Sequence, residues 1–494
     1  MSNAHADRYD VWGRIGQGGM SEVWLARHVG LSVPVVLKTL REDVARAGQD
    51  AHARMVSEAR LMARVTSPHV VRAIDTGELC GVPFVAQEYV DGIDLAELDR
   101  RRRAALGVGL PLWFVSEVID QSCDALSAAH RVGVIHRDVK PSNLFATPEG
   151  IRLGDFGIAV DTDSIRSADV SGTLKFMAPE LMFGERPSRA ADVYSLGATA
   201  FDLRYGSAPF LTYEQVRDPH SRPPFSAPRT ANESFFQHVL GLALEKNPDV
   251  RLPDPKSFQK HIRTLRRTLS RDAMARSAVP TGPTTFRLGR CEVSLVVGDI
   301  TESDADAIVS SANYQMKMRT GVSDALRRAG GDEIESAAMA EGERELGTCV
   351  ATRAGRLRAK HVLHAVSAWK GSSVVGRTTH RALLMAEELG ARSIAFCALG
   401  TGAANITLET CANAIMSTLR FHLALGGSRL ERVTVYLIDD EKLRAFREVT
   451  LDALRVMADG DGDVGLACDQ TALARGDAAT CISTDSVLRS HRVA

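Results

Sequence analysis

Apolar and polar residues alternate along the first part of the chain, as they do in half-buried β-strands. Residues 9–40 show this alternation, which is interrupted by the glycine-rich stretch GQGG and ends in the apolar run VPVVLKTL at 33–40. A period of two predicts strands, so we expect a strand–turn–strand unit closed by a third strand. A further strand is expected at FVAQEYV, residues 84–90.

Helical spacing follows these strands. Apolar residues recur at helical intervals within residues 48–66, and a longer helical pattern runs from 112 to 132. It is preceded by the basic run Arg100–Arg103, which we interpret as a solvated helix cap rather than as a docking site for an acidic partner. Beyond residue 155 the pattern predicts loops and then helices up to residue 270.

The pattern changes again after a stretch rich in Pro, Gly, Ser and Thr. We interpret residues 271–286 as a linker because these residue types concentrate there. From 287 to 456, short apolar runs such as CEVSLVV and RVTVYLI alternate with helical segments. This order predicts an α/β domain with a largely parallel sheet. Residues 457–494, which contain the acidic run DGDGD near their start, are expected to be disordered.

Composition narrows the class of protein. A chain of 494 residues is too long for one hydrophobic core, and its formal net charge of −1 gives no reason to expect a nucleic-acid partner. The eight cysteines form no C-x-x-C pair, which argues against a disulfide framework and favours a cytoplasmic location. No apolar run is long enough to span a membrane.

Candidate chemistry begins at the glycine-rich stretch IGQGGMSEV, residues 15–23. Glycines between two strands let the backbone approach phosphates closely, although an ordinary hairpin can carry the same pattern. Lys38 ends the apolar run VVLK, where its ammonium could hold phosphates, and Glu58 on the next predicted helix could pair with it.

The stretch HRDVKPSN, residues 136–143, supplies the parts of a phosphoryl-transfer site. Asp138 can accept a proton from an attacking hydroxyl, Lys140 can neutralise the moving phosphoryl group, and Asn143 can ligate a metal ion. The strand IRLGDFG then brings Asp155 as a second metal ligand. Four such motifs in this order indicate phosphoryl transfer.

With these motifs, residues 9–270 resemble the bacterial eukaryote-like Ser/Thr protein kinases. The resemblance implies a two-lobed α+β fold with ATP and Mg²⁺ or Mn²⁺ in the cleft, the metal being held by Asn143 and Asp155. The catalytic residues that it implies are Asp138, Lys140, Lys38, Glu58 and Thr173. The residues that it assigns to ATP are Ile15, Gly16, Gln17, Gly18, Gly19, Val23, Val36, Lys38, Glu88 and Val90.

Two positions in this resemblance indicate the substrate class. Lys140, two residues after Asp138, and Thr173 in SGTLKFMAPE match kinases that phosphorylate Ser and Thr hydroxyls. Arg137 before Asp138 is typical of sites that are ordered by phosphorylation, so we expect autophosphorylation, with a homodimer as one route to it. The resemblance also implies that Glu180 pairs with Arg251 and that Asp192 is buried near the catalytic loop.

A second set of nucleotide-binding signals follows the predicted linker. In VVGDITESDADAIVSSAN, residues 296–313, Asp299 follows a strand and could accept an adenine amino hydrogen, and Asn313 could bond a ribose hydroxyl. The glycines of ALGTGAANI, residues 398–406, could cradle a diphosphate between a strand and a helix.

Together these signals resemble the macro domain family over residues 287–456. The resemblance implies an α/β/α three-layer fold that binds ADP-ribose or a related nucleotide. The residues that it assigns to this ligand are Asp299, Ile300, Asn313, Gly321, Val322, Gly400, Thr401 and Gly402. The family's first loop is usually a glycine run, but this chain has Lys317-Met318-Arg319-Thr320 there, which speaks against hydrolysis of ADP-ribosyl bonds.

The sequence therefore predicts a multidomain Ser/Thr protein kinase with a macro-like module that binds ADP-ribose or an ADP-ribosylated protein. Two alternatives stay open. In one, the module also removes ADP-ribose, so that the protein is bifunctional. In the other, both halves are catalytically silent and only recognise nucleotides.

Overall fold

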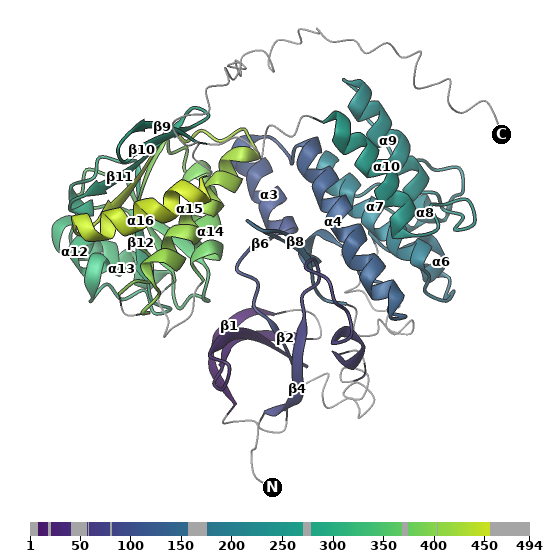
Figure 1. The fold of residues 1–494 in the computed structure, drawn as a ribbon, viewed down its shortest axis with the longest axis horizontal. Coiled ribbons are helices and arrows are strands. Elements are labelled where there is room, and N and C mark those ends of the chain that lie inside the picture. The colour runs from purple at the N-terminus through teal and green to yellow at the C-terminus, as the bar shows by residue number, and fades with distance from the viewer. Residues whose placement is uncertain are drawn as a thin grey trace. The chain divides into compact units, whose positions relative to one another are not determined.

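A computed structural model gives the fold of the chain (Figure 1). It describes residues 8–17, 21–40, 57, 59–79, 82–156, 175–269, 278–367, 374–402 and 404–454. Four predicted site residues and the tail 457–494 lie outside them; these residues are Gly18, Gly19, Glu58 and Thr173. The described residues belong to one compact unit, in which we distinguish an N-terminal region (8–269) and a C-terminal region (278–454).

The N-terminal region opens with an antiparallel sheet of five strands in the order β1-β2-β3-β5-β4. The strands are β1 (Tyr9–Gln17), β2 (Ser21–His28), β3 (Val33–Leu40), β4 (Ala73–Leu79) and β5 (Val82–Glu88). The strands predicted at 33–40 and 84–90 are confirmed by β3 and β5, because both runs have the β-branched composition that suits a half-buried sheet.

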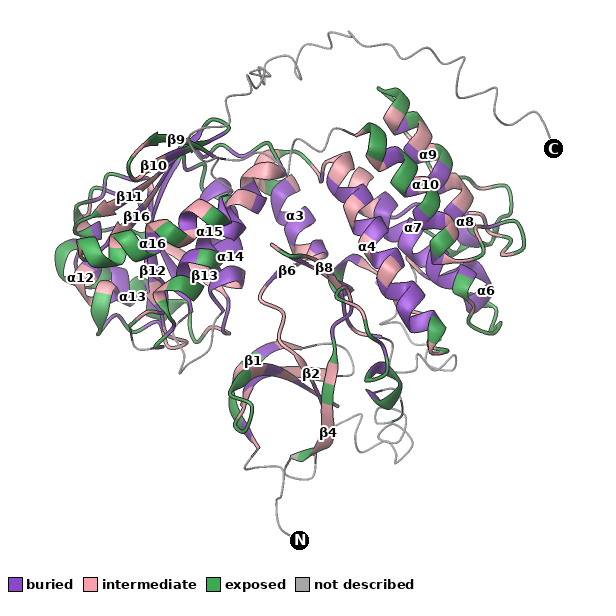
Figure 2. Ribbon diagram, viewed as in Figure 1, coloured by how far each residue is buried: buried purple, intermediate pink, exposed green. Residues whose placement is uncertain are grey.

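Helices make up most of the described N-terminal region beyond this sheet. They are α3 (Leu95–Leu106), α4 (Leu112–Arg131), α6 (Pro179–Met182), α7 (Arg189–Tyr205), α8 (Tyr213–Arg217), α9 (Ala231–Ala243) and α10 (Pro255–Thr268). A small antiparallel sheet accompanies them, made of β6 (Ile93–Asp94), β7 (Leu144–Thr147) and β8 (Gly150–Leu153). Figure 2 shows α4 and α7 buried along most of their length, and both contribute to one large apolar core. The helix predicted at 112–132 is α4.

The C-terminal region is built on an eight-stranded sheet of order β13-β14-β12-β15-β16-β11-β10-β9. Its strands are β9 (Val279–Gly282), β10 (Thr285–Leu288), β11 (Cys291–Val297), β12 (Ala307–Ala312), β13 (Cys349–Arg353), β14 (His361–Val366), β15 (Ser393–Cys397) and β16 (Arg432–Leu437). The central strands β14, β12, β15, β16 and β11 pair in parallel, as predicted, and antiparallel strands lie at both edges.

The predicted linker at 271–286 is partly wrong. Residues 279–282 and 285–288 are the edge strands β9 and β10 of the C-terminal sheet, although Val279–Gly282 reads VPTG. Proline lacks a backbone donor and is therefore tolerated on an edge strand, so the composition that marks a linker also suits this position.

Helices cover this sheet in layers. They are α12 (Gly321–Gly330), α13 (Asp332–Ala340), α14 (Val375–Glu388), α15 (Leu408–Ala424) and α16 (Asp440–Ala453). Helices α14, α15 and α16 pack in succession beside one another (Figure 1). The crossover through α12 and α13 moves along the sheet in the opposite direction to those through α14 and α15, and right-handed crossovers therefore place the two sets on opposite faces.

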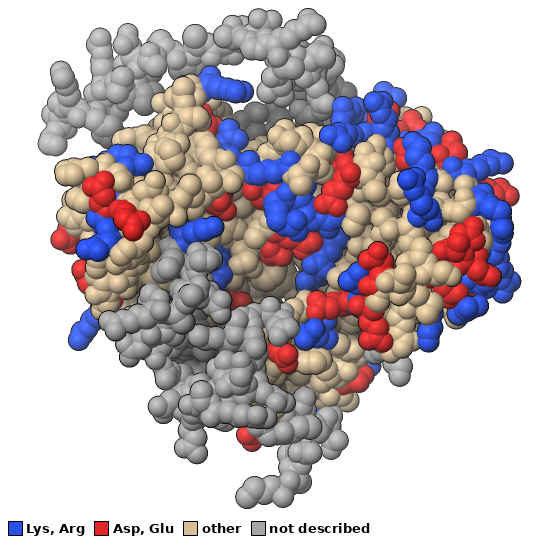
Figure 3. Space-filling model, turned by 180° about the vertical axis from the view of Figure 1, so that it is seen from behind, with Lys and Arg blue, Asp and Glu red and all other residues tan. Residues whose placement is uncertain are grey.

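The basic run at 100–103 is not a solvated cap as predicted. Arg101 and Arg102 are buried, and they bond to residues of the C-terminal region. On the face drawn in Figure 3, acidic and basic side chains are intermixed over the described surface. Among the described helices, none has the length and apolar character that a membrane span needs.

Candidate active site

The loop between α4 and the 3-10 turn η1 (Pro141–Asn143) carries the predicted base Asp138. Its carboxylate oxygen Oδ2 lies 2.8 Å from Nζ of Lys140 and accepts a hydrogen bond of 3.0 Å from Nδ2 of Asn143. The same amide also donates to the Asp138 carbonyl at 2.8 Å. Three residues predicted from one motif therefore meet around one carboxylate, which is held in a defined orientation.

The buried carboxylate of Asp192 on α7 anchors this loop by hydrogen bonds. It accepts backbone N–H groups from His136 and Arg137, each at 2.9 Å, and lies 2.7 Å from Nε2 of His130. Arg137 has a φ of 68°, a left-handed conformation that is uncommon for a residue with a side chain. Such strain persists where surrounding bonds enforce it, as the Asp192 carboxylate does here.

Asp155, just after β8, meets Lys38 of β3 although 117 residues separate them. The ammonium Nζ lies 2.8 Å from Oδ1 of Asp155, and this carboxylate is 44% exposed. Partial burial alone would raise the pKa of Asp155, but the Lys38 charge outweighs it and lowers the pKa. The carboxylate is thus ionised at neutral pH and its second oxygen can reach a ligand.

His136 joins the catalytic loop to the Asp155 segment. Its Nδ1 accepts from the Asp138 N–H at 3.2 Å and its Nε2 lies 3.0 Å from the Gly154 carbonyl, which assigns the proton to Nε2. The ring lies 4.3 Å from the Phe156 ring. Burial lowers the pKa of His136, in keeping with a neutral ring that has one donor and one acceptor.

The predicted nucleotide residues lie on adjoining strands. Gly16 of β1 pairs with Val23 of β2, and Val23 pairs in turn with Lys38 of β3. Val36 pairs with Gln87 of β5, next to Glu88, whose carboxylate accepts from Nε of Arg72 at 3.0 Å. Glu58 lies outside the described residues, so the predicted Lys38–Glu58 pair stays a prediction; among the described residues, Lys38 pairs with Asp155.

The chemistry of Asn143 and Asp155 fits a magnesium ion. Carboxylate and amide oxygens are hard ligands, and Mg²⁺ is usually bound by few protein groups together with substrate phosphates and water. Nδ2 of Asn143 faces Asp138, which leaves the amide oxygen for another partner.

A buried ion pair supports the segment after the site. Arg251 donates to both carboxylate oxygens of Glu180 at 2.7 and 2.9 Å, and the two side chains are 0% and 5% exposed. The pairing expected from the sequence therefore forms, with the parallel geometry that Arg and a carboxylate prefer.

The second predicted site lies where parallel strands of the C-terminal region end. Asp299 follows β11 and its side chain caps the turn η4 (Ile300–Glu302), accepting from the Thr301 N–H at 2.9 Å, while Ile300 is buried. Gly321 begins α12 with a φ of 58°, and Gly400 has a φ of 74° after β15. Both glycines thus adopt backbone conformations that favour glycine.

Asn313, expected to bond a ribose, uses its amide locally. Its Oδ1 accepts from the N–H groups of Gln315 and Lys317 at 3.0 and 3.2 Å, and its Nδ2 donates to the Lys317 carbonyl at 3.0 Å. A ribose contact would have to replace some of these bonds.

The loop that replaces the glycine run is filled by side chains. Met316 and Met318 are buried, and Glu335 of α13 accepts from the Met318 N–H at 2.9 Å. The second oxygen of Glu335 lies 2.7 Å from the guanidinium of Arg319. Glu335, which the sequence motifs did not single out, therefore fixes this loop by binding it at two points.

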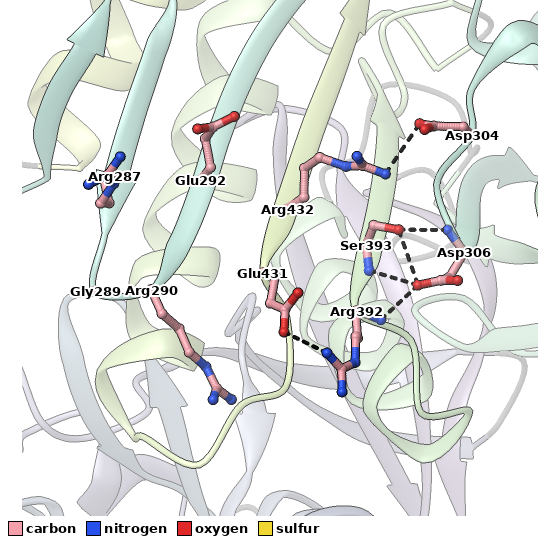
Figure 4. Close-up of a pocket in the computed structure, with 10 residues that line it drawn as sticks. All are labelled: Arg287, Gly289, Arg290, Glu292, Asp304, Asp306, Arg392, Ser393, Glu431 and Arg432. Carbon is pink, nitrogen blue, oxygen red and sulfur yellow. Dashed lines mark hydrogen bonds and ion pairs between the residues drawn. The ribbon is translucent and has the colours of Figure 1, made fainter. Parts of the chain in front are cut away.

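A separate hollow of about 790 Å³ lies at the opposite, amino ends of the parallel strands (Figure 4). Its charged groups largely neutralise one another: Arg392 pairs with Glu431 at 3.0 Å, and Arg432 with Asp304 at 3.3 Å. Asp306 accepts from the Ser393 hydroxyl at 3.1 Å and from the N–H of Arg392 at 2.9 Å. The polar side chains of this hollow thus bond mainly to one another.

Comparison with known proteins agrees with both halves. The family model of the protein kinase domain matches residues 9–276, more than half of the chain. The chain belongs to the protein kinase family. Residues 309–415 match the family model of the macro domain.

Two bacterial kinases are among the relatives of this protein kinase. The serine/threonine-protein kinase PknB of Mycobacterium leprae is 34% identical over 262 residues, which cover 50% of this chain and 41% of the relative. The serine/threonine-protein kinase PknF of Mycobacterium tuberculosis is 39% identical over 248 residues, which cover 48% of this chain and 51% of the relative. The chain thus matches about half, or less, of the length of these relatives.

Among solved structures, the PknI kinase domain of Mycobacterium tuberculosis is 30% identical to this protein kinase. The match has a TM-score of 0.43 and covers 54% of this chain and 98% of that domain.

The motif residues were visible from local spacing in the sequence, but the sequence motifs did not predict that His136 bridges the catalytic loop and the Asp155 segment. Its only sequence signal is its position directly before Arg137 and Asp138.

Proposed function

We propose that this protein kinase transfers the γ-phosphoryl group of ATP to Ser or Thr hydroxyls of proteins, itself included. The observation that carries the proposal is the Asp138 carboxylate held between Lys140 and Asn143. A carboxylate in this setting can accept the proton of an incoming hydroxyl, and an ammonium beside it can neutralise charge on the phosphoryl group.

In the proposed reaction, a Ser or Thr oxygen forms a bond to the γ-phosphorus while the bond from that phosphorus to the ADP oxygen breaks. The hydroxyl proton passes to Asp138. Lys38, which is paired with Asp155, would hold the α- and β-phosphates. Asn143 and Asp155 would hold Mg²⁺, which supplies charge neutralisation to the phosphates when bound.

The test of this proposal compares Asp138→Asn with the parent, using radiolabelled ATP and a generic protein acceptor. We expect a loss of at least about a hundredfold in rate, the usual contribution of a positioned acid or base. Asp124→Asn, on the exposed side of α4, is the control and should keep the parent rate. Equal labelling by Asp138→Asn and the parent would refute the proposal, and phospho-amino-acid analysis checks the Ser/Thr specificity.

For the C-terminal region we propose binding of ADP-ribose or of an ADP-ribosylated protein, without hydrolysis. Support comes from Asp299 and from two glycines with positive φ, Gly321 at the start of α12 and Gly400 in the loop after β15. The buried Met316 and Met318 occupy the loop where hydrolysis would need glycines. Calorimetry with ADP-ribose tests binding, and absence of binding heat would refute it. Incubation with a mono-ADP-ribosylated protein tests hydrolysis, and release of ADP-ribose would refute the proposal that the region only binds.

A further inference from the structure

Three residues that the kinase resemblance assigns to ATP share one apolar cluster with residues of the C-terminal region. Ile15 belongs to this cluster, and Val23, Val36 and Tyr89 pack against it. The members from the C-terminal region are Ala312, Met316, Ala338, Leu346, Val366 and Val374, with Tyr314 and Val350 packed against them. Met316 is 0% and Ile15 9% exposed, so solvent is nearly excluded from this cluster.

Contacts along β1 extend this cluster. The guanidinium of Arg14 lies 3.4 Å from a carboxylate oxygen of Glu345. A Cβ added to Gly13 would lie 3.9 Å from a methyl carbon of Leu346, which is ordinary van der Waals contact. The strand that leads into the glycine-rich loop thus contacts the segment around Leu346.

Two ion pairs join α3 to α14 beside the cluster. Arg101 donates to both oxygens of Glu388 at 2.7 and 2.8 Å, and Arg381 lies 2.7 Å from Glu97. Burial alone would raise the pKa of Glu97, but the Arg381 guanidinium lowers it, so the pair is charged. Arg–carboxylate pairs with two bonds are geometrically specific, which distinguishes them from casual surface contacts.

A fully buried arginine continues the contact. Arg102 is 0% exposed and donates to the carbonyl of Gly426 at 2.9 Å, at the end of α15. Nearby, the rings of Phe114 on α4 and Phe421 on α15 meet edge to face at 5.4 Å. One nitrogen of the buried guanidinium is thus bonded to the C-terminal region, whereas its Nε and its other terminal nitrogen have no partner among the described residues.

We call residues 89–91, directly after β5, the hinge. The C-terminal region binds this segment as well. Asp91, next to the predicted ATP residue Val90, accepts from the N–H groups of Gly376 and Arg377, both at 2.8 Å. These donors belong to the first turn of α14, where unpaired N–H groups favour a carboxylate. The C-terminal region therefore contacts both the strands above the nucleotide site and its hinge.

We propose that this docked arrangement covers the adenine side of the kinase cleft, and that ATP binds only after the C-terminal region separates from α3 and the hinge. An adenine ring would contact the same faces of Ile15, Val23 and Val36 that the apolar cluster around Met316 contacts. A close-packed interior has no room for both the ring and these side chains. The inference rests on the proposed function only in naming ATP as the nucleotide.

The experiment reverses one ion pair and then restores it. Glu97→Arg and Arg381→Glu each place like charges where a pair now lies 2.7 Å apart, and the double variant recreates an opposite pair. The full chain is measured by small-angle scattering for its radius of gyration and by binding of a fluorescent ATP analogue for Kd. Arg392→Glu combined with Glu431→Lys, an exposed pair in the same region, is the matched control.

Each single variant should enlarge the radius of gyration and lower Kd by about tenfold, if the docked form outweighs the open form by about ten to one. The double variant should return both values to within about twofold of the parent, and the control should change neither. Opening without a change in Kd would overturn the inference, and so would single variants that leave the radius of gyration unchanged. If the analogue binds as expected but no phosphoryl group is transferred, the proposed function fails and the docking inference stands.

Discussion

At the scale of single residues, the same kind of ion pair has different weights in different surroundings. Arg251 and Glu180 are almost fully buried, whereas Arg392 and Glu431 are 72% and 52% exposed. A buried pair that loses one partner leaves an uncompensated charge, while water replaces a lost partner at the surface. The free energy of unfolding should therefore fall far more when Arg251 is replaced than when Arg392 is replaced.

Replacing Arg251 by Ala should lower the free energy of unfolding of the N-terminal region by about 3–5 kcal/mol, because Glu180 is then buried without its partner. Arg392→Ala should cost less than about 1 kcal/mol, since its pair is exposed and 3.0 Å apart. Urea unfolding followed by tryptophan fluorescence measures both. Equal effects of the two substitutions would contradict this assignment.

How far single residues could be predicted depends on sequence distance. Asp138, Lys140 and Asn143 lie within one loop, so their meeting follows from local spacing. Arg101 meets Glu388 across 287 residues, and a basic run on a helix looks solvated when its acidic partners are unknown. The burial of Arg102 could not be inferred for the same reason, because carbonyls at the end of α15 accept its bonds.

At the scale of elements, strands with β-branched runs could be predicted closely, as β3 shows at Val33–Leu40. The edge strand β9 could not, because its sequence VPTG has turn composition and its pairing depends on β10. The loop around Asn313 likewise depends on tertiary contacts, since Glu335 on α13 holds it. Composition reports local preference, and in both places a distant partner decides the structure.

Gly400→Ala should destabilise the turn between β15 and α15. At a φ of 74°, an added Cβ would also meet a methyl carbon of Ile406, so we expect a loss of more than about 1 kcal/mol. Gly402→Ala is the matched control, because, apart from its chain neighbours, none of the described residues has an atom within 4 Å of its added Cβ. Thermal unfolding of the C-terminal region measures the difference, and comparable melting temperatures for the two variants would refute the prediction.

At the scale of the whole molecule, docking of the C-terminal region is linked to proton uptake by Asp91 in the hinge. Burial raises the pKa of Asp91 to about 6, against the two N–H groups of α14 that lower it. The other charged and titratable groups that act on it are Tyr89 and Arg377. In the separated form the carboxyl should return to an ordinary pKa of about 3.9. The docked form therefore binds more protons between these two pH values.

Docking should accordingly strengthen as pH falls from 7 towards 5, within the window set by the pKa of about 6. Small-angle scattering of the full chain should show a smaller radius of gyration at pH 5 than at pH 7. Asp91→Asn removes the titrating group and should flatten this dependence. An unchanged pH profile in Asp91→Asn would show that another group is responsible.

The short connection between the two regions limits what separation can mean. Helix α10 ends at Thr268 and β9 begins at Val279, so even a fully extended connection spans at most about 40 Å. A released C-terminal region is thus confined near its docking face, at an effective concentration on the order of millimolar. Dilution of the protein cannot shift this balance, and a detached C-terminal fragment would have to reach a similar concentration to restrain the kinase in trans.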